Sequence, residues 1–315
     1  MKMYIPVPTK FISSFTEALP FDVYVERSEG IYTAIYKKNS SHDEKQLARY
    51  EEKNIKNLFI SRNDKLEFEN FLINLNDLEH YEKTHIIEIL KASLELNFEY
   101  LDFASQELQT NLELATQNVK NSLYLLENDL QMAMDIFKSL ASSSHLLKHS
   151  YMVSLFSIVL AKRLGMKTER VILAIGLGGL LHDIGQTRMD QALFLKNNLS
   201  AKDWEEIKDH PQLGLKILDH NNCINTEVRS IIIQHHEQFN GRGYPNRLHN
   251  NQIFPPAKIV AIADGFCSLI SLTSYRKTNK TPKEAIEIMR DDLGHYDPDY
   301  LEIFAAMVLQ SKELK

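Results

Sequence analysis

The chain of 315 residues is long enough for two domains, and its 43% hydrophobic and 25% charged content is typical of soluble globular proteins. The net charge of -6 excludes the basic surface that binds nucleic acid, although a local site can still bind a small anion. The longest apolar runs are too short for a bilayer span, and the first residues lack the apolar core of a secretory signal. The only cysteines, Cys223 and Cys267, stand in unrelated contexts and indicate reduced thiols, so we expect a cytoplasmic protein that does not enter a membrane.

Residues 1–75 have the pattern of a small α/β or α+β domain. The segments "FDVYVE" (21–26) and "IYTAIYKK" (31–38) alternate apolar and polar residues around Gly30, which predicts a two-stranded hairpin. Residues 43–60 predict a helix that runs into a short strand. Nothing in this domain suggests chemistry, and we expect it to be regulatory or to bind a signalling partner.

Residues 76–144 predict connecting helices, because the composition is strongly helical and glycine and proline are absent. Apolar residues form a short heptad-like seam. Its members are Leu112, Val119, Leu126, Ala133 and Leu140, with Leu123, Leu130 and Phe137 four residues after three of them. The seam either packs on its own domain or forms a homodimer that transmits a signal.

Residues 145–315 predict an all-helical domain, so the fold class of the whole chain is mainly α. No alternation of strands and helices is visible, and the glycines stand where helices end or turn. The small residues of "GLGG" at 176–179 are expected to let helices approach closely rather than to bind a phosphate. Nine of the twelve histidines lie between His145 and His295, which concentrates the candidate chemistry in this domain.

The histidines and carboxylates of this domain suit a metal centre. In chain order the candidates are His145, His149, His182, Asp183, His210, His235, His236, Glu237 and Asp264. Neutral imidazole and carboxylate bind Fe, Mn, Zn, Co and Ni, and the set is larger than one mononuclear site needs. Because no cysteine joins the set, a structural zinc site is disfavoured. Two metals held by such ligands typically serve the displacement of a phosphoryl group.

The motifs that carry these residues resemble the HD-GYP family, a branch of the HD phosphohydrolase superfamily. The matching segments are "HSYMV", "LLHDIG", "HPQLGLKIL", "HHEQFNGRGYP", "KIVAIADGF" and "HYDPDY", which occur in the family's order over residues 145–310. The resemblance implies a helical bundle with two or three metals. It also implies an enzyme that hydrolyses cyclic di-GMP to the linear dinucleotide pGpG and, in some members, to GMP.

The resemblance also implies a role for each metal-binding position. His149, His182, Asp183 and Asp264 would hold one metal, with Asp183 bridging to a second metal held by His210, His235 and His236. We expect two divalent transition metal ions, iron first and manganese as the alternative. A hydroxide that bridges them would attack phosphorus, with Asp183 and His182 as the catalytic pair. His145 stands where the family often has a glutamate for a third metal and is a candidate further ligand.

The substrate-facing residues are expected in the "GRGYP" loop and two other segments. Gly241 and Gly243 would allow a sharp turn through positive φ angles. The predicted substrate contacts are Gln186, Arg242, Gly243, Tyr244, Pro245 and Arg276. Three positions depart from the family pattern: Gln186 replaces a frequent lysine, Thr273 an arginine, and Asn240 an aspartate.

These departures leave the metal-binding set complete and the substrate-facing set incomplete. We therefore expect a cyclic di-GMP phosphodiesterase and keep two alternatives open. One is a catalytically weak or inactive protein that binds cyclic di-GMP and signals through partners, which dock on the N-terminal domain or the GYP loop. The other is a hydrolase of the HD superfamily that acts on another nucleotide.

Overall fold

The computed structural model describes residues 3–15, 17–40, 44–75, 81–99, 105–128, 135–136, 138–196, 198–218, 224–271 and 280–310. The chain forms two compact units, Met1–Ser143 and Ser144–Lys315. Among the described residues, no helix combines the length and the apolar character that a membrane crossing requires.

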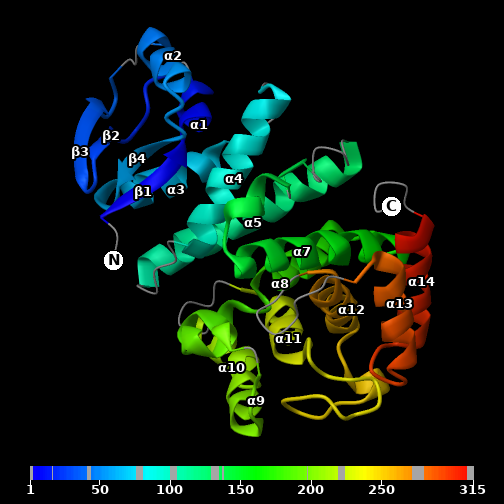
Figure 1. Cartoon of the computed structure of the whole chain (residues 1–315). Coiled ribbons are helices and arrows are strands. Elements are labelled where there is room, and N and C mark those ends of the chain that lie inside the picture. Colours follow the sequence, from blue (N-terminus) through cyan, green and yellow to red (C-terminus); the bar gives the residue numbers. More distant parts are fainter. Residues whose placement is uncertain are drawn as a thin grey trace. The chain divides into compact units, whose positions relative to one another are not determined.

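The N-terminal unit contains a four-stranded antiparallel sheet (Figure 1). Its strands are β1 (Tyr4–Pro8), β2 (Val23–Ser28), β3 (Ile31–Tyr36) and β4 (Asn57–Ser61), in the spatial order β1-β4-β2-β3. The β2–β3 hairpin confirms the prediction from the alternating segments, and α2 (Glu44–Glu52) followed by β4 confirms the predicted helix and strand. Strand β1 and the short helix α1 (Thr9–Ser13) were not predicted from the sequence. Pro6 and Pro8 weaken the strand signal of β1, but an edge strand tolerates proline.

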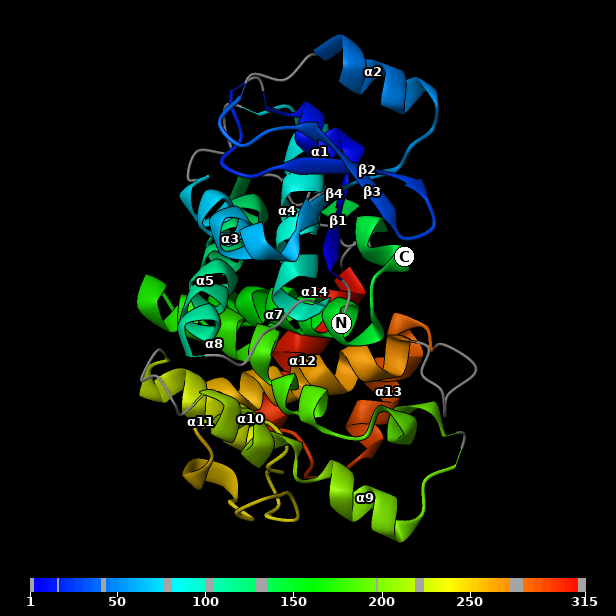
Figure 2. The ribbon, with the colours of Figure 1, turned by 90° about the vertical axis from the view of Figure 1, so that its left-hand side faces the viewer.

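One face of this sheet is the core of the unit. The inward residues alternate along the strands and are almost fully buried: Ile5, Val7, Val23, Val25, Leu58 and Ile60. Helices α1 and α4 (Lys83–Glu99) both contact β1 and lie on one side of the sheet in Figures 1 and 2. This alternation of buried and exposed side chains is what an antiparallel sheet with one covered face requires.

Besides α1 and α2, three helices lie in the described part of the N-terminal unit. Helices α3 (Lys65–Asn74) and α4 pack against α5 (Ser105–Asn128), and the short turns η1 (Arg62–Asp64) and η3 (Leu140–Ser142) flank this group in sequence. The seam residues Leu112, Val119 and Leu123 are buried within the unit, as packing on the seam's own domain requires. Leu130, Ala133 and Phe137 of the seam lie outside the described residues.

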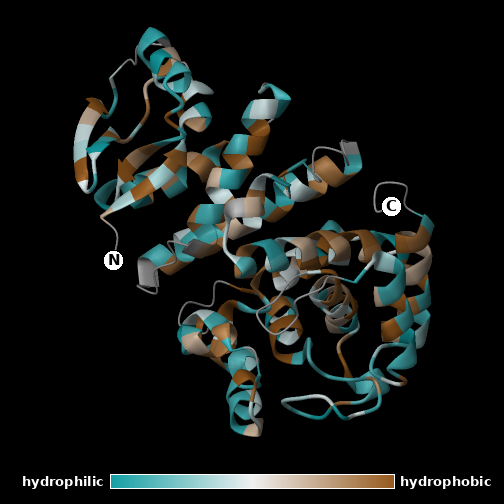
Figure 3. Cartoon of the chain, viewed as in Figure 1, coloured by the Kyte–Doolittle hydropathy of each residue, from teal (hydrophilic) through white to brown (hydrophobic). Residues whose placement is uncertain are grey.

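The described part of the C-terminal unit contains helices and no strand, which confirms the mainly α fold. The first half is α7 (His145–Arg163), α8 (Glu169–Leu181), η4 (Ile184–Arg188), η5 (Gln191–Leu195), α9 (Ala201–Ile207) and α10 (His210–Leu218). The second half is α11 (Thr226–Gln234), η7 (Asn250–Gln252), α12 (Pro255–Ile270), α13 (Pro282–Asp291) and α14 (Pro298–Gln310). Figure 3 shows many hydrophobic residues on α7 and α12, whereas α2 and α9 are largely hydrophilic.

Small residues let the helices of this unit approach closely, as "GLGG" predicts. A Cβ at Gly179 would lie 3.0 Å from the Cα of Ser154 in α7, and one at Gly178 would lie 2.6 Å from the Ile231 side chain. A Cβ at Gly185, in "LLHDIG", would overlap the carbonyl oxygen of His210. Since α7, α8, α10 and α11 carry or border the candidate ligands, these close contacts determine how near the ligands lie to one another.

Candidate metal centre

The structure brings seven predicted metal ligands together from five helices. His149 lies within α7, His182 and Asp183 follow α8, His210 begins α10, His235 and His236 follow α11, and Asp264 lies within α12. His236 is partly exposed and the other six are buried. Histidines and carboxylates are rarely buried together without a partner that compensates their lost hydration, so the cluster needs a chemical explanation.

Three of the histidines are oriented by the helix that precedes them. The Nδ1 atoms of His182, His210 and His235 lie 2.8, 2.7 and 2.7 Å from the carbonyl oxygens three residues earlier, Gly179, Ile207 and Ile232. A carbonyl oxygen only accepts, so each Nδ1–H is the donor, and in the neutral ring each Nε2 keeps its lone pair. These carbonyls belong to the last turns of α8, α9 and α11. A histidine whose Nδ1–H is fixed in this way is the usual arrangement of a metal ligand.

The Asp183 carboxylate lies between two groups of histidines. Its Oδ2 is 3.2 Å from Nε2 of His182 and 3.8 Å from Nε2 of His149. Its Oδ1 is 3.2 Å from Nε2 of His210. Two groups of potential ligand atoms result, and within each group the atoms lie within 4.8 Å of one another. One group is Asp183 with His149 and His182, and the other is Asp183 with His210, His235 and His236. One carboxylate with an oxygen toward each group has the arrangement that a bridging ligand needs.

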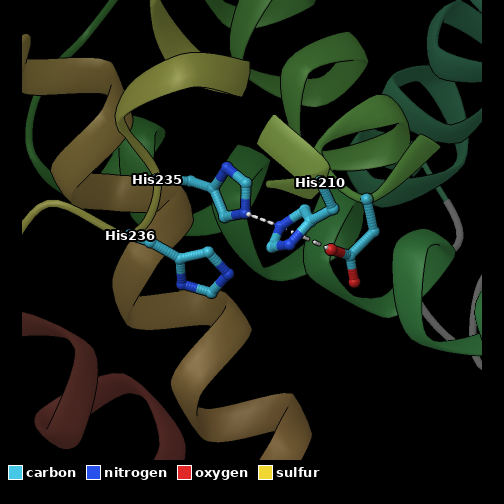
Figure 4. Close-up of side chains that lie close together, drawn as sticks. His210, His235 and His236 are labelled. Carbon is cyan, nitrogen blue, oxygen red and sulfur yellow. Dashed lines mark hydrogen bonds and ion pairs between the residues drawn. The ribbon is translucent and has the colours of Figure 1, made fainter. Parts of the chain in front are cut away.

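The group of Asp183, His210, His235 and His236 shows why a cation fits this site. Figure 4 shows the rings of His235 and His210 turned toward each other, and their Nε2 atoms are 3.1 Å apart. When both rings are neutral with their proton on Nδ1, the two Nε2 lone pairs face each other and neither nitrogen can donate. A cation between these atoms removes the repulsion. Nε2 of His182 also makes no hydrogen bond within the described part of the chain. Nitrogen and carboxylate donors of this kind fit divalent transition metals.

Asp264 extends the group of His149, His182 and Asp183. Its Oδ1 is 3.0 Å from Nε2 of His149, and its Oδ2 is 4.0 Å from Nδ1 of His236. His145 lies apart from both groups: it is exposed at the start of α7, and its ring centroid is 6.0 Å from that of His149.

The charges of the site are strongly coupled in the metal-free protein. Burial lowers the pKa of His182, but the Asp183 and Asp264 carboxylates more than offset this and raise it to about 9. Burial raises the pKa of Asp183, yet the surrounding histidines hold it well below its usual value. Burial and neighbouring histidines lower the pKa of both His235 and His236 well below the usual value. Ionised carboxylates and neutral imidazoles are the forms that bind metals.

The GYP loop lies directly against this site. The Tyr244 ring stacks on the His236 ring with centroids 4.7 Å apart, and the Tyr244 N–H donates to the His236 carbonyl. Pro245 follows through a cis peptide bond, and Arg242 is exposed. The prediction for the two glycines was half right. Gly241 has a φ of +77°, but Gly243 does not have a positive φ and is needed because a Cβ there would overlap the backbone of residues 236–238.

Of the three remaining positions that we expect to face the substrate, the structure describes one. Gln186 lies in η4 directly after the Asp183 segment and is half-buried. Thr273 and Arg276 lie outside the described residues.

Two features beside the site differ from what the sequence predicted: Glu237, a candidate ligand, belongs to neither ligand group, and the "HYDPDY" segment had no predicted role. The Glu237 carboxylate turns into the GYP loop, where it accepts the backbone N–H groups of Asn246 and Leu248. The "HYDPDY" segment also holds this loop, because Phe239 and Asn240 donate backbone hydrogen bonds to His295 and Gly294. The motif matches included both features, but a motif does not reveal backbone partners.

Comparison with known families identifies the class of this protein. The family model described as HD domain matches residues 135–300, more than half of the chain. The chain belongs to the HD-GYP branch of this family, as the "HHEQFNGRGYP" segment and the clustered ligands indicate.

Curated relatives match half of the chain or more at about 30% identity. A cyclic di-GMP phosphodiesterase from Pseudomonas aeruginosa is 30% identical over 168 residues, which cover 53% of this chain and 40% of that protein. One from Thermotoga maritima is 31% identical over 160 residues, covering 50% and 43%. The 3'3'-cGAMP-specific phosphodiesterase 2 from Vibrio cholerae is 28% identical over 196 residues, covering 61% and 37%. The chain therefore spans less than half the length of these relatives.

A solved structure resembles the whole chain. It is an HDG"Y"P protein from Bdellovibrio bacteriovorus, with a TM-score of 0.64, 20% sequence identity, and coverage of 97% of this chain and 99% of that one. The likeness shows that the N-terminal fold as well as the helical domain occurs in another HD-type protein.

Proposed function

We propose that this protein is a metal-dependent phosphodiesterase that hydrolyses cyclic di-GMP to pGpG and/or GMP. The observation that carries the proposal is the opposed pair of Nε2 atoms on His210 and His235, beside a carboxylate that serves both histidine groups. The relatives named as cyclic di-GMP phosphodiesterases support the choice of substrate.

The proposed cofactor is a pair of divalent metal ions, with iron as the first choice and manganese as the alternative. The first ion would be held by His149, His182, Asp183 and Asp264, and the second by Asp183, His210, His235 and His236. When bound, such ions lower the pKa of water and neutralise charge on a phosphate.

The chain's own residues would orient the substrate and the ligands. Asp183 stays ionised, so it presents one oxygen to each histidine group and does not act as a proton donor. His182 is fixed by its Nδ1–H bond to Gly179, which keeps Nε2 directed at Asp183. Arg242 and Tyr244 lie on the loop beside His236, where a guanidinium can pair with a phosphate and a phenol can donate to one.

The proposal extends to the rest of the chain. Residues 1–75 would form a regulatory or partner-binding region, and residues 76–144 would connect it to the hydrolase domain of residues 145–315. We place the protein in cytoplasmic signalling. A homodimer through the seam would be an additional way to pass a signal.

The test uses protein purified without oxygen and loaded separately with Fe(II) and Mn(II). Chromatography follows the loss of cyclic di-GMP, with Asp183→Ala as the inactive control. Loss that requires both metal and Asp183 is expected. Full metal content and full activity in Asp183→Ala would contradict the bridging assignment.

Gln186 favours a second candidate function. It takes the place of a lysine that the family pattern often has, so a positive charge near the scissile phosphate is absent from this position. A weak or inactive binder of cyclic di-GMP would show binding in calorimetry without product in the same sample. Because a Vibrio cholerae relative is specific for 3'3'-cGAMP, that dinucleotide should be assayed beside cyclic di-GMP.

A further inference from the structure

Glu237 directly follows the two adjacent histidines, but its carboxylate has other partners. The residue is 3% exposed and belongs to neither group of candidate ligands. Oε1 accepts the backbone N–H of Asn246 at 2.7 Å, and Oε2 accepts that of Leu248 at 2.9 Å. Both oxygens are thus used at the far end of the GYP loop.

These bonds join the two ends of the loop 237–248. Between its ends, the loop folds back on His236 through the Tyr244 N–H and the stacked Tyr244 ring. Gly243 lies against the backbone of residues 236–238, so the loop cannot move closer to this backbone. The position of Tyr244 and Arg242 beside a candidate ligand therefore depends on the closure of the loop.

A buried carboxylate is costly unless hydrogen bonds replace its hydration. Charge-assisted bonds to backbone N–H groups do so and are stronger than bonds between neutral groups. Glu237 has such bonds at both oxygens, and glutamine could not keep both, because its amide nitrogen donates and does not accept.

We propose that Glu237 is a positioning residue that closes the GYP loop, so that Arg242 and Tyr244 face the phosphate groups of the substrate. It does this without binding metal. The inference rests on the proposed phosphodiesterase function for its substrate, but the loop closure can be tested without any substrate.

The test compares Glu237→Gln with a matched control, Glu227→Gln, at the start of α11, the helix that precedes Glu237. Glu227 pairs with Arg170 at the surface and has no role in the site. Trypsin is the probe of the loop, because Arg242 and Arg247 are exposed and both lie within it. Cleavage after these two residues in the metal-loaded protein is followed by mass spectrometry, together with metal content and the KM for cyclic di-GMP.

In Glu237→Gln we expect cleavage at Arg242 and Arg247 to be about tenfold faster, as the loss of one charge-assisted bond would give. Metal content should equal that of the wild type. The KM should rise about tenfold with kcat within about twofold, because the loop binds substrate while the centre stays intact. Glu227→Gln should match the wild type in all three measurements.

Three outcomes would overturn the proposal. Unchanged cleavage in the loop would mean that Glu237 does not close it. Loss of metal would make Glu237 a ligand. Cleavage that rises equally throughout the chain would mean that the whole fold depends on Glu237. If the wild-type protein does not hydrolyse cyclic di-GMP, the proposed function fails, and the cleavage and metal measurements still decide the role of Glu237 in the loop.

Discussion

At the scale of single residues, the site is defined by the direction of histidine nitrogens. The sequence predicted which side chains would meet, because their motifs resemble a family with a known ligand order. It did not show that Nδ1 of His182, His210 and His235 is bound to the backbone, since that depends on the angle at which each helix ends. Nor did it show that Asp183 has one oxygen toward each histidine group.

Removing one ligand of the second group should remove one metal. In His235→Ala the opposed Nε2 atom is lost, and we expect bound metal to fall from two ions per chain to one, with kcat reduced more than about 100-fold. Elemental analysis after gel filtration measures the metal. His249→Ala, at an exposed histidine outside the ligand groups, is the control and should keep both ions.

The metal-free protein should lose stability as the pH rises. The pKa of His182 is raised from 6.5 to about 9 in the folded state. Its protonated form therefore stabilises the fold fully below pH 6.5, and this contribution, up to about 3 kcal/mol, is lost as the pH rises through 9. Urea unfolding in EDTA between pH 6.5 and 9 measures the loss. A flat profile in the metal-free protein would refute the coupling, whereas His182→Gln should be flat.

At the scale of elements, the prediction succeeded where the pattern is local. The hairpin β2–β3, the order α2–β4 and the helical domain follow from periodicity alone. Strand β1 was missed because its pairing partner, β4, lies about 50 residues later and its prolines are unfavourable in an isolated strand. Gly243 was given the wrong reason because close approach to residues 236–238 is a tertiary contact.

The contact between α7 and α8 should be sensitive to one methyl group. Gly179→Ala places a Cβ 3.0 Å from the Cα of Ser154, and backbone cannot move aside as a side chain can. We expect a loss of about 1–3 kcal/mol in the free energy of unfolding, measured in urea. Gly178→Ala would place its Cβ 2.6 Å from the side chain of Ile231, which is fully buried and β-branched, and should cost at least as much. No loss of stability in Gly179→Ala would show that the helices separate easily.

At the scale of the whole molecule, we expect removal of the metals to affect the stability of only one of the two compact units. All seven candidate ligands lie in the unit Ser144–Lys315. The family match, residues 135–300, covers this unit and not the sheet. The sequence indicated this division through the concentration of histidines after residue 145.

Chelation should therefore destabilise one unit only. Ligand that is present at about 1,000 times its Kd stabilises the folded state by about 4 kcal/mol, and EDTA removes this contribution. Trp204, the only tryptophan, lies in α9 of the metal-binding unit, so its fluorescence reports that unit. We expect EDTA to lower the fluorescence Tm by several degrees. The N-terminal unit should unfold in a separate step in circular dichroism, and EDTA should leave the Tm of that step unchanged.

The carbonyls that fix three of the ligand rings have a second role in the fold. Each belongs to the last turn of a helix, at Gly179 of α8, Ile207 of α9 and Ile232 of α11, where carbonyl groups otherwise lack a partner. A cation bound at this site would hold the rings, and the rings hold the helix ends. Fraying of these ends and release of metal would then be one event, and occupancy of the centre should appear as slowed amide hydrogen exchange in three turns that are far apart in the chain.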